Sequence, residues 1–163
     1  MAGTKILLKS LQRHLGKAFL FLFVSTDLVY AGSPDLDTTF QETDDLKPCN
    51  VYAKHKEEVE HIVKDMSPNF VIVRGPFIYG LPAFPDSSAT SFFLELLKNL
   101  KNGSAVQLFE DEFRTPCFIG DALDIIVNSA LKFVDAPESE ELRIFNLTSG
   151  HTLSRMEFGE VRK

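Results

Sequence analysis

Two short apolar runs, each following an amphipathic segment, constrain the fold of this chain more than any other feature. The runs are residues 18–24 (AFLFLFV) and 70–74 (FVIVR). Each is far shorter than the roughly 20 apolar residues needed to cross a bilayer, so each predicts a buried strand. The segments before them, 4–18 and 51–66, carry apolar residues at helical spacing. This alternation predicts an α/β fold with a largely parallel sheet.

The rest of the chain continues the same alternation. The pattern predicts a helix over 91–101, a strand over 106–109, a helix over 121–133 and a strand over 143–147. The chain thus has four predicted strands, and it resembles a segment of a doubly wound domain. Near the end, Ser154 begins a capping box, but only about six residues follow the box, too few for a stable helix.

Length and charge narrow the class of protein. At 163 residues the chain fits one domain, which we expect to span 1–163. The 17 Lys and Arg against 23 Asp and Glu give a net charge of −6, which argues against nucleic-acid and anionic-membrane partners. Cys49 and Cys117, without a signal-peptide pattern, indicate reduced thiols of a cytoplasmic protein. The basic first segment is also similar to an organellar presequence, but the strand that follows at once favours a helix of the domain.

Tyr52 and Lys56 form the first candidate site. On the predicted helix 51–66 their spacing of four places both side chains on one face. A nearby ammonium favours the phenolate, so the pair suits a general acid or base at a carbonyl or carbinol. The pattern Y-x-x-x-K alone is weak, because a half-buried tyrosine beside a solvated lysine is the commoner arrangement.

A polar triplet, Ser25-Thr26-Asp27, follows the first strand, where open α/β sheets place their chemistry. The motifs STDLVY, YAKHK and VIVRGPFIYG, in this order, resemble the extended short-chain dehydrogenase/reductase superfamily. EDEFRTPCFIGDALDII and RIFNLTSGHTLSR resemble its later segments. Within the superfamily, STD followed by an apolar residue and VY is similar to the dTDP-4-dehydrorhamnose reductase branch, to which the regulatory β subunit of methionine adenosyltransferase also belongs.

The resemblance implies catalytic and cofactor-binding roles for four residues. Thr26 would be the hydroxyl that orients the carbonyl, and Tyr52 the proton donor. Lys56 would favour the phenolate and bind the nicotinamide ribose of NADP or NAD. Pro76 would lie near the nicotinamide.

Arg114 is the candidate for the substrate end, where a guanidinium suits the phosphates of a nucleotide sugar. An equally good explanation is an ion pair with a neighbouring acid: Glu110, Asp111 or Glu112. We interpret Asp121 as an acid in the first turn of a helix and not as a catalytic group. Leu28 stands where sugar dehydratases of the superfamily carry an acid, which disfavours dehydration.

The chain also departs from the superfamily. No two of its nine glycines are two or three residues apart, so it has no dinucleotide fingerprint. Gly75 and Gly80 fit G-x-x-x-x-G, but Leu81-Pro82 follows where a phosphate loop needs Lys and Ser or Thr. The resemblance therefore implies a truncated, partial Rossmann-like domain from which amino-terminal βαβ units are missing. The sequence has neither the His and Cys spacing of a metal site nor a G-x-S-x-G elbow.

Three functional hypotheses remain open from the sequence. The leading one is a reductase-type module for NAD(P)H-dependent reduction of a 4-keto nucleotide sugar, impaired by truncation. The alternatives are a non-catalytic regulatory or interaction module and an inactive fragment. Apolar faces that would meet the missing strands predict a homo-oligomer or a protein partner.

We predict that the 163-residue chain binds NADPH and NADH poorly, because it lacks the glycine turn and helix N-terminus that hold a pyrophosphate. Isothermal titration with each dinucleotide measures this directly. A dissociation constant in the low micromolar range for either one would contradict the prediction.

Overall fold

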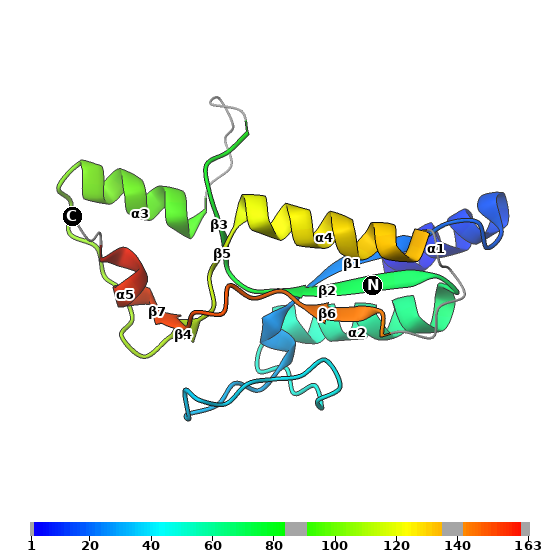
Figure 1. Ribbon diagram of the computed structural model, residues 1–163, viewed down its shortest axis with the longest axis horizontal. Coiled ribbons are helices and arrows are strands. Elements are labelled where there is room, and N and C mark those ends of the chain that lie inside the picture. The colour runs from blue at the N-terminus through cyan, green and yellow to red at the C-terminus, as the bar shows by residue number, and fades with distance from the viewer. Residues whose placement is uncertain (1, 84–90, 135–141, 161–163) are drawn as a thin grey trace. The chain divides into compact units, whose positions relative to one another are not determined.

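The computed structural model describes residues 2–83, 91–134 and 142–160. The chain forms two compact units, Met1–Gly75 with Asp124–Leu147, and Pro76–Leu123 with Thr148–Lys163. The single domain expected over 1–163 stays a prediction. In chain order the elements are α1 (Ala2–Leu15), β1 (Phe21–Thr26), the 3-10 helix η1 (Asp27–Val29), α2 (Val51–Met66), β2 (Phe70–Gly75), β3 (Ile78–Tyr79), α3 (Phe92–Lys101), β4 (Phe113–Arg114), β5 (Cys117–Phe118), α4 (Ile119–Val134), β6 (Ile144–Asn146), β7 (Leu153–Ser154) and α5 (Arg155–Gly159) (Figure 1).

The first unit is built on a parallel sheet with the strand order β1-β2-β6. Phe21 of β1 pairs with Phe70 of β2, and the pairing continues to Thr26 opposite Gly75. Since the strands are parallel, their carboxyl ends meet at one edge of the sheet. The predicted α/β class with a parallel, Rossmann-like sheet is confirmed.

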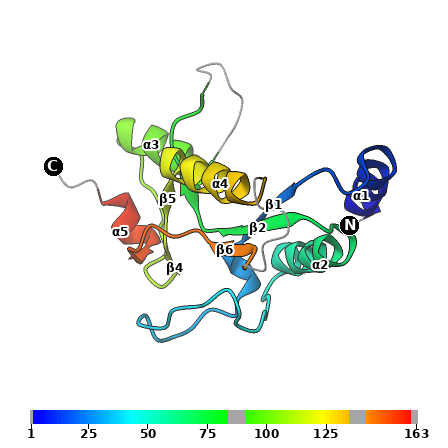
Figure 2. The same ribbon diagram turned by 45° about the vertical axis from the view of Figure 1, so that its right-hand side comes forward.

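Helices cover both faces of this sheet, as expected for a doubly wound arrangement. On one face, Ile72 of β2 packs in a buried cluster with Val63 of α2 and Leu8 of α1. On the other face, the ring of Phe145 in β6 lies 6.1 Å from that of Phe133 in α4, centroid to centroid. Figures 1 and 2 both show α2 and α4 on opposite sides of the strands.

The helix ends of the first unit follow from local sequence signals. α1 ends before Gly16, whose φ of 62° is a left-handed conformation that glycine adopts without strain. α2 begins after Asn50, whose side chain accepts a hydrogen bond of 2.8 Å from the Ala53 amide. α2 ends at Met66, just before Ser67-Pro68, because the residue preceding a proline disfavours the helical conformation. These predicted ends are confirmed to within about two residues.

The second unit has short strands and an aromatic core. β3 pairs with β5 in parallel and β4 with β7 in antiparallel orientation. The Phe158 ring of α5 lies 5.2 Å from the rings of Phe77 and Tyr79, and 6.1 Å from that of Phe93. The capping box at Ser154 is present with both of its hydrogen bonds, and it begins a helix of five residues.

The strand expected within residues 18–24 is present, but it is shifted to Phe21–Thr26. Its expected burial is wrong at Val24, which is 39 % exposed, because β1 is an edge strand with β2 as its one neighbour in the described sheet. A second expectation is wrong altogether. The strand predicted over 106–109 is a loop. Its backbone bonds to the start of α5, where the Met156 amide donates to the Phe109 carbonyl.

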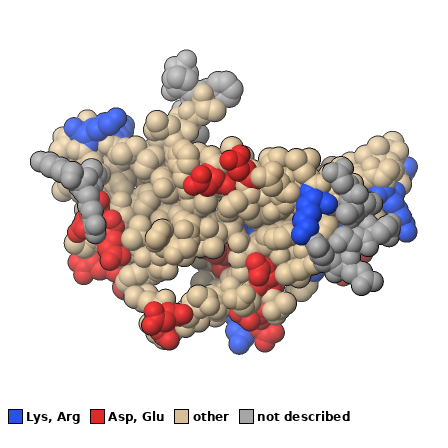
Figure 3. Space-filling view, viewed as in Figure 1, with Lys and Arg blue, Asp and Glu red and all other residues tan. Residues whose placement is uncertain are grey.

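Surface and helix properties bear on partners. In the described part of the chain, no helix is both long and apolar enough to span a membrane. On the face seen in Figure 3, Lys and Arg side chains lie in separate groups and not in one continuous patch.

We predict that Ile72→Ala destabilises the first unit by about 2–5 kcal/mol, because Ile72 is fully buried and the surrounding side chains cannot close the cavity. Urea unfolding followed by circular dichroism gives the free energy of unfolding. Ile6→Ala is the control, since Ile6 is 68 % exposed and its loss costs at most about 0.5 kcal/mol. Equal losses in the two variants would show that Ile72 is not a core residue.

Candidate functional site

Thr26 is the last residue of β1, and its side chain shapes the turn that follows. The Thr26 side chain caps η1, because Oγ1 accepts a hydrogen bond of 3.3 Å from the Leu28 amide. The same hydroxyl donates to Oδ1 of Asp27 at 3.2 Å. Thr26 is only 5 % exposed, so its hydroxyl is held in one place at the carboxyl edge of the sheet.

Tyr52 lies in the first turn of α2 and is open to solvent. Its side chain is 54 % exposed. Among the described residues its hydroxyl has no hydrogen-bond partner, so the phenol is free to bond a ligand. The Asn50 cap fixes the start of the helix two residues before it.

Lys56 reaches from α2 to the backbone of β1. Its Nζ donates to the Val24 carbonyl oxygen at 2.8 Å, and it lies 4.9 Å from the Phe23 ring centroid and 5.7 Å from that of Tyr52. Burial lowers the pKa of Lys56, while the charge of Glu60, one turn further along α2, opposes that shift.

These contacts place three of the predicted site residues at one edge of the first unit. Lys56 bonds the backbone two residues before Thr26, and Tyr52 lies one helical turn before Lys56 on α2. The groups at this edge are a hydroxyl, a phenol and an ammonium group. Their roles in a reaction stay predictions.

Pro76 and Arg114 belong to the second unit. Pro76 directly follows Gly75, the last residue of β2. Arg114 lies in β4, with Nη1 3.9 Å from Oε1 of Glu112. The same Glu112 oxygen binds Arg155 more closely, at 2.8 Å. The ion pair that the sequence offered as an alternative for Arg114 is therefore present.

Sequence reasoning missed a buried polar network beside this site. Its centre is Arg74 of β2, which is 2 % exposed and pairs with Glu60 of α2 at 2.8 Å. Burial opposes the charge of Arg74, but the hydrogen bonds and charge of Glu60 outweigh it, so the pKa of Arg74 is raised. Arg74 also donates to the Tyr30 hydroxyl at 2.6 Å, and that hydroxyl donates to Asn146 of β6 at 2.9 Å. An arginine within the apolar run FVIVR was the available signal.

Ser25 is a second residue that the sequence analysis did not assign. It is 5 % exposed, and its Oγ is one of two buried side-chain polar atoms without a hydrogen-bond partner among the described residues. It pairs in register with Arg74 across the sheet. The adjacent pair of hydroxyl residues at a strand end was its signal.

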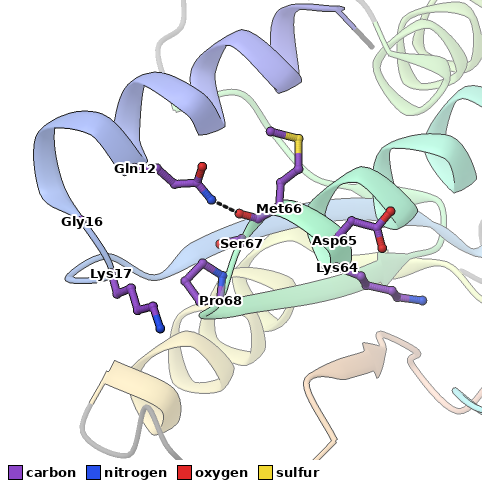
Figure 4. A pocket seen from close by; sticks show the side chains of 8 residues that line it. All are labelled: Gln12, Gly16, Lys17, Lys64, Asp65, Met66, Ser67 and Pro68. Carbon is purple, nitrogen blue, oxygen red and sulfur yellow. Dashed lines mark hydrogen bonds between the residues drawn. The ribbon is translucent and has the colours of Figure 1, made fainter.

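A pocket of about 450 Å³ lies elsewhere in the first unit. Figure 4 shows it between the carboxyl ends of α1 and α2, where the Gln12 side chain donates to the Met66 carbonyl. Met66 is 14 residues after Tyr52 on α2, or about 21 Å at the helical rise of 1.5 Å per residue. The pocket is therefore separate from the candidate site. In the described part of the chain, no three His, Cys, Asp or Glu side chains gather as metal ligands do.

Comparisons with known proteins show the family to which this chain belongs. Residues 12–162 match the model of the RmlD substrate binding domain. The probable low-salt glycan biosynthesis reductase Agl14 of Haloferax volcanii is 30 % identical over 140 residues, which cover 86 % of this chain and 43 % of that protein. The methionine adenosyltransferase 2 subunit beta of Danio rerio is 24 % identical over 149 residues, 91 % of this chain and 43 % of that protein.

A solved structure shares the fold. The dTDP-4-dehydrorhamnose reductase of Bacillus anthracis in complex with NADP superposes with a TM-score of 0.75 at 20 % identity, covering 97 % of this chain and 50 % of that one. The chain thus spans half or less of the length of these relatives. Because residues 12–162, nearly the whole chain, match the family model, the chain belongs to the RmlD substrate-binding domain family, in the dTDP-4-dehydrorhamnose reductase branch of the extended short-chain dehydrogenase/reductases.

Proposed function

We propose that this chain supplies the proton-donating site for NAD(P)H-dependent reduction of a 4-keto nucleotide sugar. The observation that carries the proposal is the solvent-open Tyr52 hydroxyl, one helical turn from Lys56, at the edge where β1 ends in Thr26. In this reaction the reduced nicotinamide supplies the hydride to the carbonyl carbon. Tyr52 gives its proton to the carbonyl oxygen as negative charge develops there.

Thr26 is suited to hold that oxygen. Its Oγ1 accepts a hydrogen bond from the Leu28 amide, which fixes the oxygen atom but leaves the hydroxyl proton free to rotate. That proton bonds Asp27 in the structure. Turning it toward a ligand costs one hydrogen bond of 3.2 Å and gains one to the reacting oxygen.

Lys56 is suited to serve both tyrosine and cofactor. An ammonium has three N–H donors, and the Val24 carbonyl takes one of them. The other two donors are available to a ribose hydroxyl and to the Tyr52 phenol. The hydrogen bond to the Val24 carbonyl also restrains the lysine side chain, so the ammonium keeps its position beside Tyr52.

The nicotinamide half of the cofactor fits these residues better than the pyrophosphate half. Tyr52 and Lys56 present donors to a ribose. Among the described helices, none begins directly after a glycine-rich turn of the kind that cradles a pyrophosphate; α2, for example, follows Pro48-Cys49-Asn50. Pro76 and Arg114 remain our proposed contacts to the nicotinamide and to the substrate phosphates. We propose the cytoplasm as the site of this activity, because both cysteines are free thiols.

A non-catalytic regulatory module is the second candidate function. The likeness to the methionine adenosyltransferase β subunit favours it. Exposed apolar side chains on α4 also favour a homo-oligomer or a protein partner, since Val127, Leu131 and Val134 are each at least half exposed and lie on one helical face. In this case the site residues would be present without turnover.

We predict that Tyr52→Phe lowers kcat by about 10²- to 10⁴-fold, the usual contribution of a positioned general acid. The assay uses this chain fused behind the amino-terminal half of a dTDP-4-dehydrorhamnose reductase, with NADPH and a 4-keto dTDP-sugar. Thr26→Val loses one hydrogen bond and should cost about 1–3 kcal/mol in the barrier. Tyr79→Phe is the matched control, because its ring packs in the aromatic core of the second unit.

Turnover of the Tyr52→Phe fusion within about threefold of the parent, far short of general acid catalysis, would contradict the assignment. A fusion that binds NADPH but shows no turnover with any 4-keto dTDP-sugar would favour the regulatory module instead.

We predict that Lys56 titrates below the ordinary lysine pKa of 10.5, because burial disfavours its charged form. Glu60→Gln should lower the pKa of Lys56 further, since the Glu60 charge favours the ammonium. Reductive ¹³C-methylation and an NMR titration measure this pKa. Glu58→Gln, at an exposed position on the same helix, is the control and should leave it unchanged. A Lys56 pKa at or above the ordinary value would contradict the prediction.

A further inference from the structure

The buried Arg74 side chain makes two sets of hydrogen bonds. We call the bonds to Glu60 the helix arm and the bonds to Tyr30 and Glu42 the loop arm. Its Nε and Nη2 donate to the Glu60 carboxylate, the shortest of these bonds being 2.8 Å. Its Nη1 donates to the Tyr30 hydroxyl at 2.6 Å and to the Glu42 carbonyl at 3.1 Å. One guanidinium thus holds α2 on one side and the loop between η1 and α2 on the other.

The two arms reach the two segments that carry the candidate site. Glu60 lies on α2, four residues after Lys56 and eight after Tyr52, so all three share one helical face. Tyr30 caps the carboxyl end of η1, four residues after Thr26. Side-chain exposure falls along this face of α2, from 54 % at Tyr52 to 0 % at Glu60.

Further bonds fix the loop arm to the sheet. The Tyr30 hydroxyl donates to Asn146 Oδ1 at 2.9 Å, and the Tyr30 ring stacks on Phe40 with centroids 4.9 Å apart. Asn146 lies at the end of β6. Its side-chain Nδ2 donates to the Phe40 carbonyl, and its backbone amide donates to Oε1 of the Glu42 carboxylate. The loop is therefore tied to β2 and β6 at the same edge where β1 ends.

A buried ion pair of this kind is a poor source of stability. The loss of hydration of two charges largely cancels their attraction, so hydrophobic replacement of both partners is often neutral for stability. Arg74 and Glu60 are 2 % and 0 % exposed. The planar guanidinium instead fixes the directions of its hydrogen bonds, because its N–H donors have a rigid, forked geometry.

We propose that Arg74 is a positioning residue that sets the spacing between Thr26 at the end of β1 and the Tyr52–Lys56 pair on α2. This inference rests on the proposed function of those three residues. It assigns Glu60 and Tyr30 as the two attachment points. Arg74 acts through them and touches no reacting atom.

Two amides report on the two arms without any substrate. The Leu28 amide donates to Thr26 Oγ1, and the Ala53 amide donates to Asn50 Oδ1 at the start of α2. The Ile72 amide, which donates to the Arg143 carbonyl at 2.8 Å within the sheet, reports on the rest of the unit. Hydrogen exchange by NMR on the 163-residue chain measures all three in one sample.

Single variants separate the arms. Tyr30→Phe removes the shorter of the two bonds from Arg74 to the loop, leaves the bond to the Glu42 carbonyl and keeps the ion pair. Exchange at Leu28 should therefore rise about threefold to tenfold, the equivalent of one net hydrogen bond, while Ala53 and Ile72 stay unchanged. Arg74→Lys keeps a positive charge for Glu60 but cannot also bond the loop. It should therefore also raise exchange at Leu28 and leave exchange at Ala53 and Ile72 unchanged. Arg143→Met is the control, because Arg143 bonds Asn69 at the other end of the sheet.

The double variant Arg74→Met/Glu60→Leu removes both attachments without leaving a buried charge. It should melt within a few degrees of the parent and still speed exchange at both Leu28 and Ala53 relative to Ile72. If exchange at Leu28 relative to Ile72 is unchanged in both Tyr30→Phe and Arg74→Lys, the proposal is overturned. This holds even if the double variant fails to fold. The kcat of the Tyr52→Phe fusion decides the proposed function separately, since no exchange measurement depends on turnover.

Discussion

The parallel pairing of β1 with β2 is the constraint on which the first unit depends. Parallel neighbours cannot be joined by a tight turn, so the chain must cross back over the sheet before it can form the second strand. Here the crossover consists of η1, the loop to residue 50, and α2. Thr26 starts this crossover and Tyr52 begins its helix. The same connection that closes the sheet therefore brings the polar groups of the site to one edge.

The sequence predicted the parts of this unit whose signals are local. The ends of α2 could be read from its apolar spacing and from Ser67-Pro68, and the pairing of Tyr52 with Lys56 from helical geometry. The exposure of Val24 could not be read, because burial of an apolar strand depends on which neighbours it finds. Nor could the Arg74 network, whose partners lie 14 to 44 residues away in sequence.

The second unit was harder to predict for a different physical reason. Its strands are two residues long, below the length at which alternation becomes visible. Order there comes from rings around Phe158 and from Arg155, which stacks 4.4 Å from the Phe92 centroid while bonding Glu112. The strand expected at 106–109 is a loop, and the Phe109 carbonyl at its end accepts a hydrogen bond from the Met156 amide of α5.

The contact between Lys56 and the Val24 carbonyl has a consequence for sequence divergence. The acceptor is a backbone oxygen, so it is present whatever side chain occupies position 24. A substitution at position 24 therefore leaves the acceptor of the ammonium in place, provided that β1 keeps its register with β2. The place of the charge thus depends on where the strand lies and not on the side chain that the strand carries at position 24.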